Sequence, residues 1–363
     1  MKDKRILICL LMISTFFISM MALLATADTT VSTNARSSAL YNPDTDIFLH
    51  SKNAKLKLPM ASTTKIITAL IAIEELDLNE EICISRDAVG VEGSSVYLKE
   101  NDILTARDLI YSVLLQSAND AATALAIHIS GSIPAFAEKM TSRATQIGAT
   151  DTSFQNPHGL DSNDHYTTAY DLALITAEAL KNETFKQICS TYRYTFKLGD
   201  ATRTVVNHNK LLKKYDGCIG VKTGYTQKSG RCLVSAAERN GVTLVAVTLN
   251  DPDDWMDHTN MLNHGFDELE QVNLLNIITI PESIATLSTD GATVPIGLAS
   301  DSIVKRLDEN IEYYIDLPSY IAYDVRKDDR LGEVKLTVGN RTKTINIIAL
   351  SDVKIKKATR RFL

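Results

Sequence analysis

The sequence has few cysteines and no paired metal ligands. Its 363 residues include five cysteines, too few for a fold held together by disulfides. No His-Glu-x-x-His or Cys-x-x-Cys motif occurs, and the seven histidines are scattered. Because zinc sites need clustered ligands, the sequence predicts no metal site and no cofactor.

The sequence also lacks an excess of positive charge and two common catalytic loops. Lys and Arg number 38 against 44 Asp and Glu, a formal net charge of −6, which argues against nucleic acid as a partner. Val221 precedes Lys222-Thr223 where a phosphate-binding loop needs glycine. No Gly-x-Ser-x-Gly is present, which argues against an α/β-hydrolase. With 45% hydrophobic and 23% charged residues, the chain is typical of globular proteins.

The N-terminus has the layout of an export signal. Lys2, Lys4 and Arg5 precede an apolar run over 6–25, and Ala25-Thr26-Ala27 follows. This pattern predicts a signal peptide at 1–27, cleaved after Ala27. An uncleaved anchor is the alternative, because about 20 apolar residues can span a bilayer. Both interpretations place the remainder of the chain outside the cytoplasm.

The remaining pattern predicts an α/β (α+β) protein of two domains. The first, at 28–270, begins with two strands around a turn at Asn42-Pro43-Asp44. A helix that starts at Ser62 is apolar on nearly every side and is therefore predicted to be buried. Apolar periodicity predicts further helices at 106–115, 120–129, 133–147, 168–180 and 253–268, and strands at 218–222, 232–237 and 241–250.

The C-terminal third is predicted to be all β. Alternating apolar and polar residues surround Gly339-Asn340-Arg341, which is a hairpin signal. We predict a small β-domain at 272–350, followed by a basic tail at 351–363. The tail is interpreted either as a solvated end or as a segment with weak, electrostatic association with a membrane surface.

Ser62 and Lys65 form the first candidate catalytic pair. Residues three apart share one face of a helix, so the hydroxyl and the amine can meet. A serine hydroxyl is a weak nucleophile without an adjacent base, and a lysine acts as that base when burial or a nearby cation lowers its pKa. Alone, the pair is better explained as a helix N-cap followed by a surface lysine.

Two further triplets follow in order, Ser117-Ala118-Asn119 and Lys222-Thr223-Gly224. With Ser62-x-x-Lys65 they resemble the motif set of penicillin-binding proteins and serine β-lactamases. The segments 114–122, 156–160, 166–173 and 220–226 also resemble the low-molecular-mass serine D-alanyl-D-alanine carboxypeptidases. This resemblance implies a penicillin-recognising domain, with an antiparallel sheet flanked by helices, and a small C-terminal β-domain.

The resemblance implies removal of the terminal D-alanine from peptidoglycan stem peptides, with β-lactam antibiotics as inhibitors. Ser62 would be acylated, Lys65 would accept its proton, and Ser117 would relay a proton to the leaving nitrogen. The predicted substrate-binding residues are Asn119, Lys222, Thr223, Gly224, Tyr225 and Thr226. Among these, the Tyr225 and Ser62 backbone N–H groups would form an oxyanion hole, and Thr223 and Thr226 would bind the substrate carboxylate.

Three other functions remain as alternatives. A D,D-endopeptidase would use the same chemistry on cross-links. A serine β-lactamase is disfavoured because Ala118 replaces the aspartate of its second motif and Leu180 is one place early in a Glu-x-x-Leu-Asn pattern starting at Glu178. A non-catalytic peptidoglycan-binding protein would not need the intact triplets.

Four further residues are assigned without a catalytic role. His158 is predicted to stabilise its loop by a hydrogen bond. Arg231 is predicted to be a solvated strand residue rather than a carboxylate ligand. Cys218 and Cys232 are predicted to lie too far apart for a disulfide, with the pairing of Cys83 and Cys189 left open.

Overall fold

The computed structural model describes residues 31–356. The predicted signal peptide and most of the basic tail lie outside this range, so the structure does not address them. Within it, no helix has the length and apolar character needed to cross a membrane.

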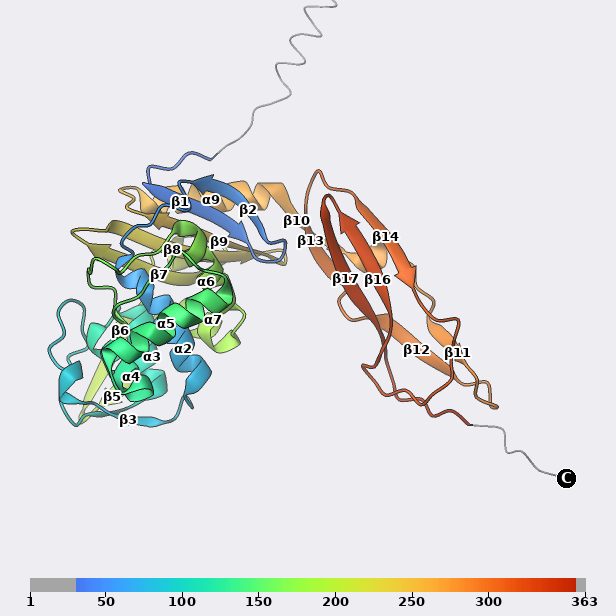
Figure 1. The fold of residues 1–363 in the computed structure, drawn as a ribbon, viewed down its shortest axis with the longest axis horizontal. Coiled ribbons are helices and arrows are strands. Elements are labelled where there is room, and N and C mark those ends of the chain that lie inside the picture. Colours follow the sequence, from blue (N-terminus) through green and yellow to red (C-terminus); the bar gives the residue numbers. More distant parts are fainter. Residues whose placement is uncertain (1–30, 357–363) are drawn as a thin grey trace, which may run out of the picture. The chain divides into compact units, whose positions relative to one another are not determined.

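A five-stranded antiparallel sheet forms the centre of the first region (Figure 1). Its order is β2 (Ile47–Lys52), β1 (Ser37–Asn42), β9 (Val242–Leu249), β8 (Gly230–Arg239) and β7 (Cys218–Thr226). The predicted turn at Asn42 is present, with the Asn42 Oδ1 accepting from the backbone N–H of Thr45 at 2.9 Å. Strands β7 and β8 are longer than predicted, because pairing continues from Thr223 opposite Leu233 to Thr226 opposite Gly230.

Helices cover both faces of this sheet (Figure 1). The predicted helices appear as α2 (Lys65–Glu75), α3 (Ala106–Leu115), α4 (Asn119–Ser130), α5 (Ile133–Ile147), α6 (Ala169–Leu180) and α9 (Asp254–Glu268). The predicted helix at Ser62 begins as a 3-10 turn, η1 (Ala61–Thr64), before α2. The elements that were not predicted are η2 (Arg86–Ala88), α7 (Glu183–Ser190), α8 (Leu211–Lys214), and the strand pairs β3 (Glu81–Cys83) with β4 (Ile103–Thr105) and β5 (Arg193–Leu198) with β6 (Ala201–Val206).

Alternation along the strands explains the two packed faces. Ala39, Val245 and Val247 belong to the core shared with helices α2 to α7. Neighbouring residues point to the opposite face, where Leu40 and Leu244 pack against α9. A Cβ added to Gly265 of α9 would lie 2.7 Å from Leu244 and 2.9 Å from Leu40. The missing side chain therefore allows close helix–sheet packing.

The C-terminal region forms its own sheet. Six strands run in the order β14 (Ile311–Asp316), β16 (Arg330–Val338), β17 (Arg341–Ala349), β12 (Thr293–Leu298), β11 (Ser283–Thr286) and β15 (Tyr320–Ile321). The predicted hairpin is confirmed, with Arg341 paired to Val338 across the Gly339-Asn340 turn. A separate cluster of buried residues, including Leu336 and Ile347, lies under this sheet.

A second, two-stranded sheet pairs β10 (Leu269–Asn273) with β13 (Ser302–Arg306), and η3 (Leu274–Asn276) follows β10. The observed sheets agree with the predicted all-β composition, while the proposed boundaries at 28–270 and 272–350 remain predictions.

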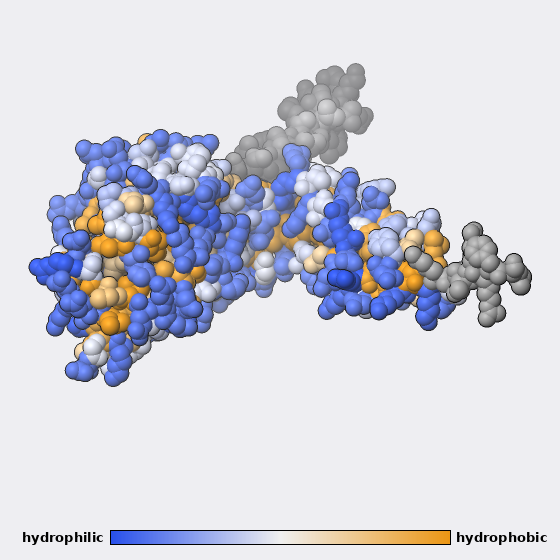
Figure 2. Space-filling model, turned by 60° about the horizontal axis from the view of Figure 1, so that its bottom comes forward, coloured by the Kyte–Doolittle hydropathy of each residue, from blue (hydrophilic) through white to orange (hydrophobic). Residues whose placement is uncertain are grey.

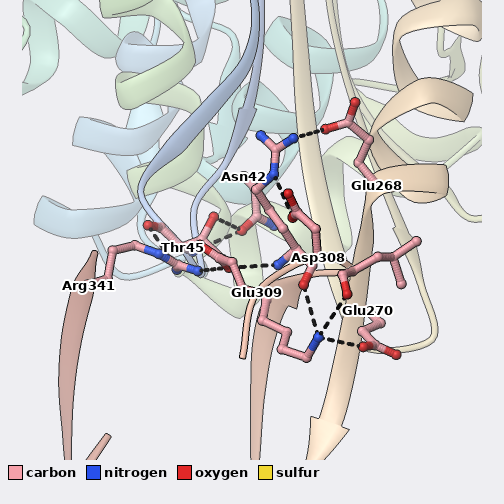
Figure 3. Close-up of polar contacts among 10 residues, drawn as sticks. Asn42, Thr45, Glu268, Glu270, Asp308, Glu309 and Arg341 are labelled. Carbon is pink, nitrogen blue, oxygen red and sulfur yellow. Dashed lines mark hydrogen bonds and ion pairs between the residues drawn. The ribbon is translucent and has the colours of Figure 1, made fainter. Parts of the chain in front are cut away.

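Ion pairs surround the connection between β13 and β14 (Figure 3). Lys305 pairs with Glu270 at 2.8 Å, and the Arg341 guanidinium pairs with Glu309 at 2.6 Å. Most of these groups are partly exposed, so each pair contributes about 0–1 kcal/mol. On the face drawn in Figure 2, hydrophilic residues predominate and hydrophobic areas lie between them.

Candidate active site

The Ser62 hydroxyl and the Lys65 amine meet at the junction of η1 and α2. Lys65 is fully buried, and its Nζ lies 2.9 Å from Ser62 Oγ, 2.7 Å from Asn119 Oδ1 and 2.5 Å from the His158 carbonyl oxygen. The pair predicted from residue spacing is therefore in contact. The third-motif residue Gly224 lies beside it, since an added Cβ there would be 2.9 Å from the Ser62 nitrogen.

The surroundings of Lys65 favour its neutral form. Burial is the main cause that lowers its pKa well below the ordinary value, and the nearby Lys222 lowers it further, while Asp120 acts in the opposite direction. A neutral amine has two N–H groups and one lone pair. The carbonyl oxygens of Asn119 and His158 can only accept, so they take both N–H groups. The lone pair then faces the Ser62 hydroxyl, which is the arrangement of a general base.

The second motif is held by a loop that precedes it. Ser117 is buried with a φ of +63° between α3 and α4, a conformation that costs about 1–3 kcal/mol outside glycine. Asn119 Nδ2 donates to the Glu92 carbonyl at 2.5 Å, and the Asn119 N–H donates to Ser94 O at 2.7 Å. A Cβ on Gly93 would lie 2.7 Å from Asn119 Nδ2, so glycine is needed there for this contact.

The third motif lies inside β7 rather than at the end of a strand, because β7 continues to Thr226. Lys222 is buried, its Nζ donates to the Thr223 carbonyl at 2.9 Å, and burial lowers its pKa to about 7. The Thr226 hydroxyl bonds Ser229 Oγ at 2.9 Å and Asp161 Oδ1 at 3.1 Å. Thr226 thus belongs to the β7–β8 turn and is not brought into the cavity described next.

A cavity of about 360 Å³ opens beside Ser62. Of the predicted site residues, its lining includes Ser62, Ser117, Thr223, Gly224 and Tyr225. The same lining contains residues that were not assigned to the site from the sequence, namely Ser94, His208, Arg231, Cys232, Asp254 and Trp255. These six residues come from four separate segments of the chain, so no local sequence pattern groups them.

Two of the remaining predictions agree with the structure and one agrees in part. The Leu160 N–H donates to His158 Nδ1 at 3.3 Å, which is the predicted loop contact. Cys232 lies opposite Gly224 and Cys218 opposite Ala237, and all four described cysteines are free. Arg231 is not merely a solvated strand residue, because its guanidinium pairs with the buried Asp254 in the cavity wall.

Gly159 allows the loop that carries the His158 carbonyl to approach Ser62. Its φ is +91°, and an added Cβ would lie 1.9 Å from the Ala61 carbonyl oxygen. Gly159→Ala is expected to displace η1 and to lower the rate of Ser62 acylation at least about 100-fold, since misplacement of about 1 Å costs this much. The rate of penicillin adduct formation measures it.

Gly148→Ala is the matched control for this variant. Gly148 has a φ of +96°, and no atom lies within 4 Å of the added Cβ. Both variants carry the cost of an alanine in the left-handed conformation, about 1–2 kcal/mol. Only the alanine at position 159 also meets a backbone atom, the Ala61 carbonyl oxygen. Equal acylation rates in the two variants would contradict the importance of this approach.

His165 connects the loop at 153–167 to the turn that carries Ser62. The Gln155 N–H donates to His165 Nδ1 at 3.0 Å, so Nδ1 is unprotonated. The Thr64 hydroxyl donates to the Ala61 carbonyl at 2.8 Å and lies 2.8 Å from His165 Nε2, which therefore carries the proton. Burial, and then the charge of Lys65, lower the His165 pKa to about 4.

The lowered His165 pKa predicts loss of stability in acid. The unfolded histidine titrates near 6.5, so the unfolded chain binds the extra proton first. The contribution of neutral His165 to the free energy of unfolding is complete above pH 6.5. It is lost as the pH falls toward 4, by up to about 1.4 kcal/mol per pH unit. The Tm measured from pH 7 to 4.5 should therefore fall less in His165→Gln, which does not titrate, than in the wild type. If the Tm of the wild type and the Tm of His165→Gln fall by the same amount between pH 7 and pH 4.5, the prediction is contradicted.

The fold and the site define a penicillin-recognising serine enzyme, with a buried lysine beside a serine at a helix start and a β-strand along the other side of the cavity. A family model described as D-alanyl-D-alanine carboxypeptidase matches residues 24–253. The chain belongs to this family of serine peptidases.

Known relatives agree with this assignment. The chain is 36% identical over 219 residues to D-alanyl-D-alanine carboxypeptidase DacF of Bacillus subtilis, covering 59% of this chain and 56% of that protein. It is 34% identical over 246 residues to the D-alanyl-D-alanine carboxypeptidase of Streptomyces sp. strain K15, covering 62% of this chain and 84% of the relative. The crystal structure of penicillin-binding protein 5 from Haemophilus influenzae matches with a TM-score of 0.66 at 25% identity, covering 89% of this chain and 98% of that one.

Proposed function

We propose that the protein removes the terminal D-alanine from peptidoglycan stem peptides through an acyl-enzyme on Ser62. The observation that carries the proposal is the contact of Ser62 Oγ with a buried Lys65 whose two N–H groups already have carbonyl acceptors. Family membership supports the substrate class. Asn119, Lys222, Thr223, Gly224 and Tyr225 are proposed as substrate-binding residues, and Thr226 as a residue that shapes the adjoining turn.

In the first half-reaction, Lys65 accepts the proton of Ser62 as Oγ attacks the carbonyl between the two D-alanines. The backbone N–H groups of Ser62 and Tyr225 are proposed to stabilise the oxyanion, which is supported by the close approach of Gly224 to the Ser62 nitrogen. The C–N bond then breaks, and Ser117 relays a proton to the departing amine. Water hydrolyses the ester and restores the Ser62 hydroxyl.

The alternatives differ in what the site must do next. A β-lactamase needs a base for fast deacylation, yet Glu178 pairs with Arg143 at 3.0 Å and with Lys181 at 2.9 Å on α6 and does not line the cavity. A D,D-endopeptidase uses the same residues and remains the second candidate. A purely binding function leaves the buried Lys65 without a role.

Two measurements test the proposal. Incubation with diacetyl-L-lysyl-D-alanyl-D-alanine should release free D-alanine, and incubation with excess benzylpenicillin should give a lasting adduct in the intact mass. Rapid turnover of the drug without an adduct would instead indicate a β-lactamase. Cleavage of a cross-linked dimer in preference to the monomeric peptide would indicate an endopeptidase. If the protein neither releases D-alanine nor reacts with the drug, a binding protein is indicated.

We also propose export, because the substrate lies outside the cytoplasm and the N-terminus has the layout of a signal peptide. Weak association of the basic residues at 351–363 with an anionic membrane surface completes the proposal. Unchanged partition with membranes after deletion of these residues would contradict it.

A further inference from the structure

The loop at 92–98 is held against the start of α4 by the side chain of Asp120. Asp120 Oδ2 accepts from the Ser95 hydroxyl at 2.5 Å and from the Leu98 N–H at 3.0 Å. Its Oδ1 accepts from the Val96 N–H at 3.2 Å, and only 1% of Asp120 is exposed. Three donors of the loop therefore converge on one buried carboxylate, which satisfies backbone groups that would otherwise need a neighbouring strand.

The conformation of the same loop is costly and depends on these contacts. Tyr97 is exposed and has a φ of +62°, a left-handed conformation that costs a non-glycine residue about 1–2 kcal/mol. Its N–H donates to Ser95 Oγ at 2.8 Å, and Val96 and Leu98 on either side are buried in the core. Such a conformation persists only where the surroundings hold it. Asp120 supplies part of that hold.

The held loop in turn orients the side-chain amide of Asn119. Asn119 Nδ2 donates to the Glu92 carbonyl at 2.5 Å, and its backbone N–H donates to the Ser94 carbonyl at 2.7 Å. With Nδ2 engaged in this way, the amide presents Oδ1 to Lys65 Nζ at 2.7 Å. A reversed amide would point N–H donors at the amine and occupy the lone pair that the Ser62 hydroxyl needs. The position of the loop therefore decides whether Lys65 can act as a base.

Asp120 also acts on Lys65 through its charge. Burial and the nearby Lys222 lower the pKa of Lys65, and Asp120 acts in the opposite direction. The other titratable side chains that face Lys65 are His158 and His165. Burial, and then the charge of Lys65, lower the pKa of His158 to about 3 and that of His165 to about 4. Both histidines are therefore neutral near pH 7, and Asp120 is the anion of this group.

We propose that Asp120 is a positioning residue for the general base: it holds the loop that orients Asn119, and its negative charge acts on the Lys65 amine. The inference rests on the proposed function, because it concerns the acylation of Ser62. The hydrogen bonds of the Asp120 carboxylate are to the loop, so it acts on the reaction through Asn119 and Lys65. Asparagine cannot replace it fully, because an amide has one acceptor oxygen, whereas loop donors approach both oxygens of Asp120.

The test measures the rate of benzylpenicillin adduct formation against pH. Asp120→Asn should lower this rate by about 10- to 100-fold, because misplacement of about 1 Å costs up to this much. It should also move the rise of the rate with pH to lower pH, because the charge that raises the pKa of Lys65 is gone. Ser95→Ala removes one contact of the loop and keeps the charge. Its acylation should therefore slow by a smaller factor, with the rise at the wild-type pH.

Asp171→Asn is the matched control. Asp171 is buried in the first turn of α6, and its Oδ2 accepts from the Asp151 N–H and from the Thr152 hydroxyl, each at 2.7 Å. Like Asp120, it is a buried carboxylate that holds a loop, but it is not among the charges that shift the pKa of Lys65. Asp171→Asn should lower the Tm and leave the rise of acylation at the wild-type pH.

The outcomes separate this inference from the proposed function. A wild type that forms no adduct contradicts the proposed function, and the inference falls with it. A wild type that is acylated, with an unchanged rate in Asp120→Asn, contradicts the inference alone. Slower acylation in Asp120→Asn with the rise at the wild-type pH also overturns it, because a merely structural role predicts that result. If Asp120→Asn does not fold, Ser95→Ala decides: slower acylation supports the inference, and an unchanged rate overturns it.

Discussion

Ser62→Ala is expected to abolish D-alanine release and the covalent penicillin adduct together. Both reactions form a bond to the same Oγ, so loss of that atom lowers both rates by at least about 10⁴-fold, as for other serine nucleophiles. Ser62 is partly exposed, and the contacts of its hydroxyl are with Lys65 and the His158 carbonyl. The fold should therefore survive, with a Tm close to that of the wild type.

Ser190→Ala is the matched control for the nucleophile. Ser190 lies on the exposed end of α7, and its replacement should leave the adduct and the D-alanine release unchanged. Intact mass with benzylpenicillin, followed by peptide mapping, measures both variants. An adduct that persists in Ser62→Ala and maps to Ser117 would assign the nucleophile to the second motif and contradict the mechanism proposed above.

Lys65→Met is expected to lower the acylation rate by about 10²–10⁴-fold, the range for loss of a general base. In the wild type, acylation should rise with pH as Lys65 loses its proton, because only the neutral amine can accept the proton of Ser62. Its pKa is lowered well below the ordinary value, so this rise belongs well below the pH at which a solvated lysine titrates. In Lys65→Met the rise should be absent. Adduct formation measured against pH tests this.

A second variant separates the base from the positive charge. Lys65→Arg keeps N–H donors for Asn119 and the His158 carbonyl, but arginine does not release its proton in proteins. Both variants should therefore be slow, whereas the exposed Lys327 can be changed to Met without effect. Acylation within tenfold of the wild-type rate in either Lys65 variant would assign the base to another group.

Much of the site could be predicted from local sequence because its parts are close in the chain. Ser62 and Lys65 are three residues apart, and this spacing allows their side chains to meet on one helical face. Ser117 lies in the short α3–α4 junction and Asn119 is the first residue of α4, at the point where the apolar periodicity stops. The long helices and the strand β9 follow from apolar patterning in the same way.

Other features depend on pairing across the chain. The contacts of Thr226 follow from strand register, which carries β7 on to the turn, where the Thr226 hydroxyl meets Ser229. Arg231 is exposed as predicted, but α9 also brings Asp254 to the start of β8, where the two side chains pair. No local pattern encodes such a contact, because residues 231 and 254 are brought together by the sheet and by the helix that packs on it.

The sequence by itself predicted the contact of Ser62 with Lys65, the motif order, the long helices and the all-β C-terminal region, since each depends on residue types at short spacing. The tertiary structure alone decided which cation faces the cavity. Lys222 and Arg231 are both basic residues, yet packing buries one near Lys65 and leaves the other exposed and paired with Asp254. Burial and hydrogen bonding set the charge and direction of a side chain, and both arise only when distant segments pack together.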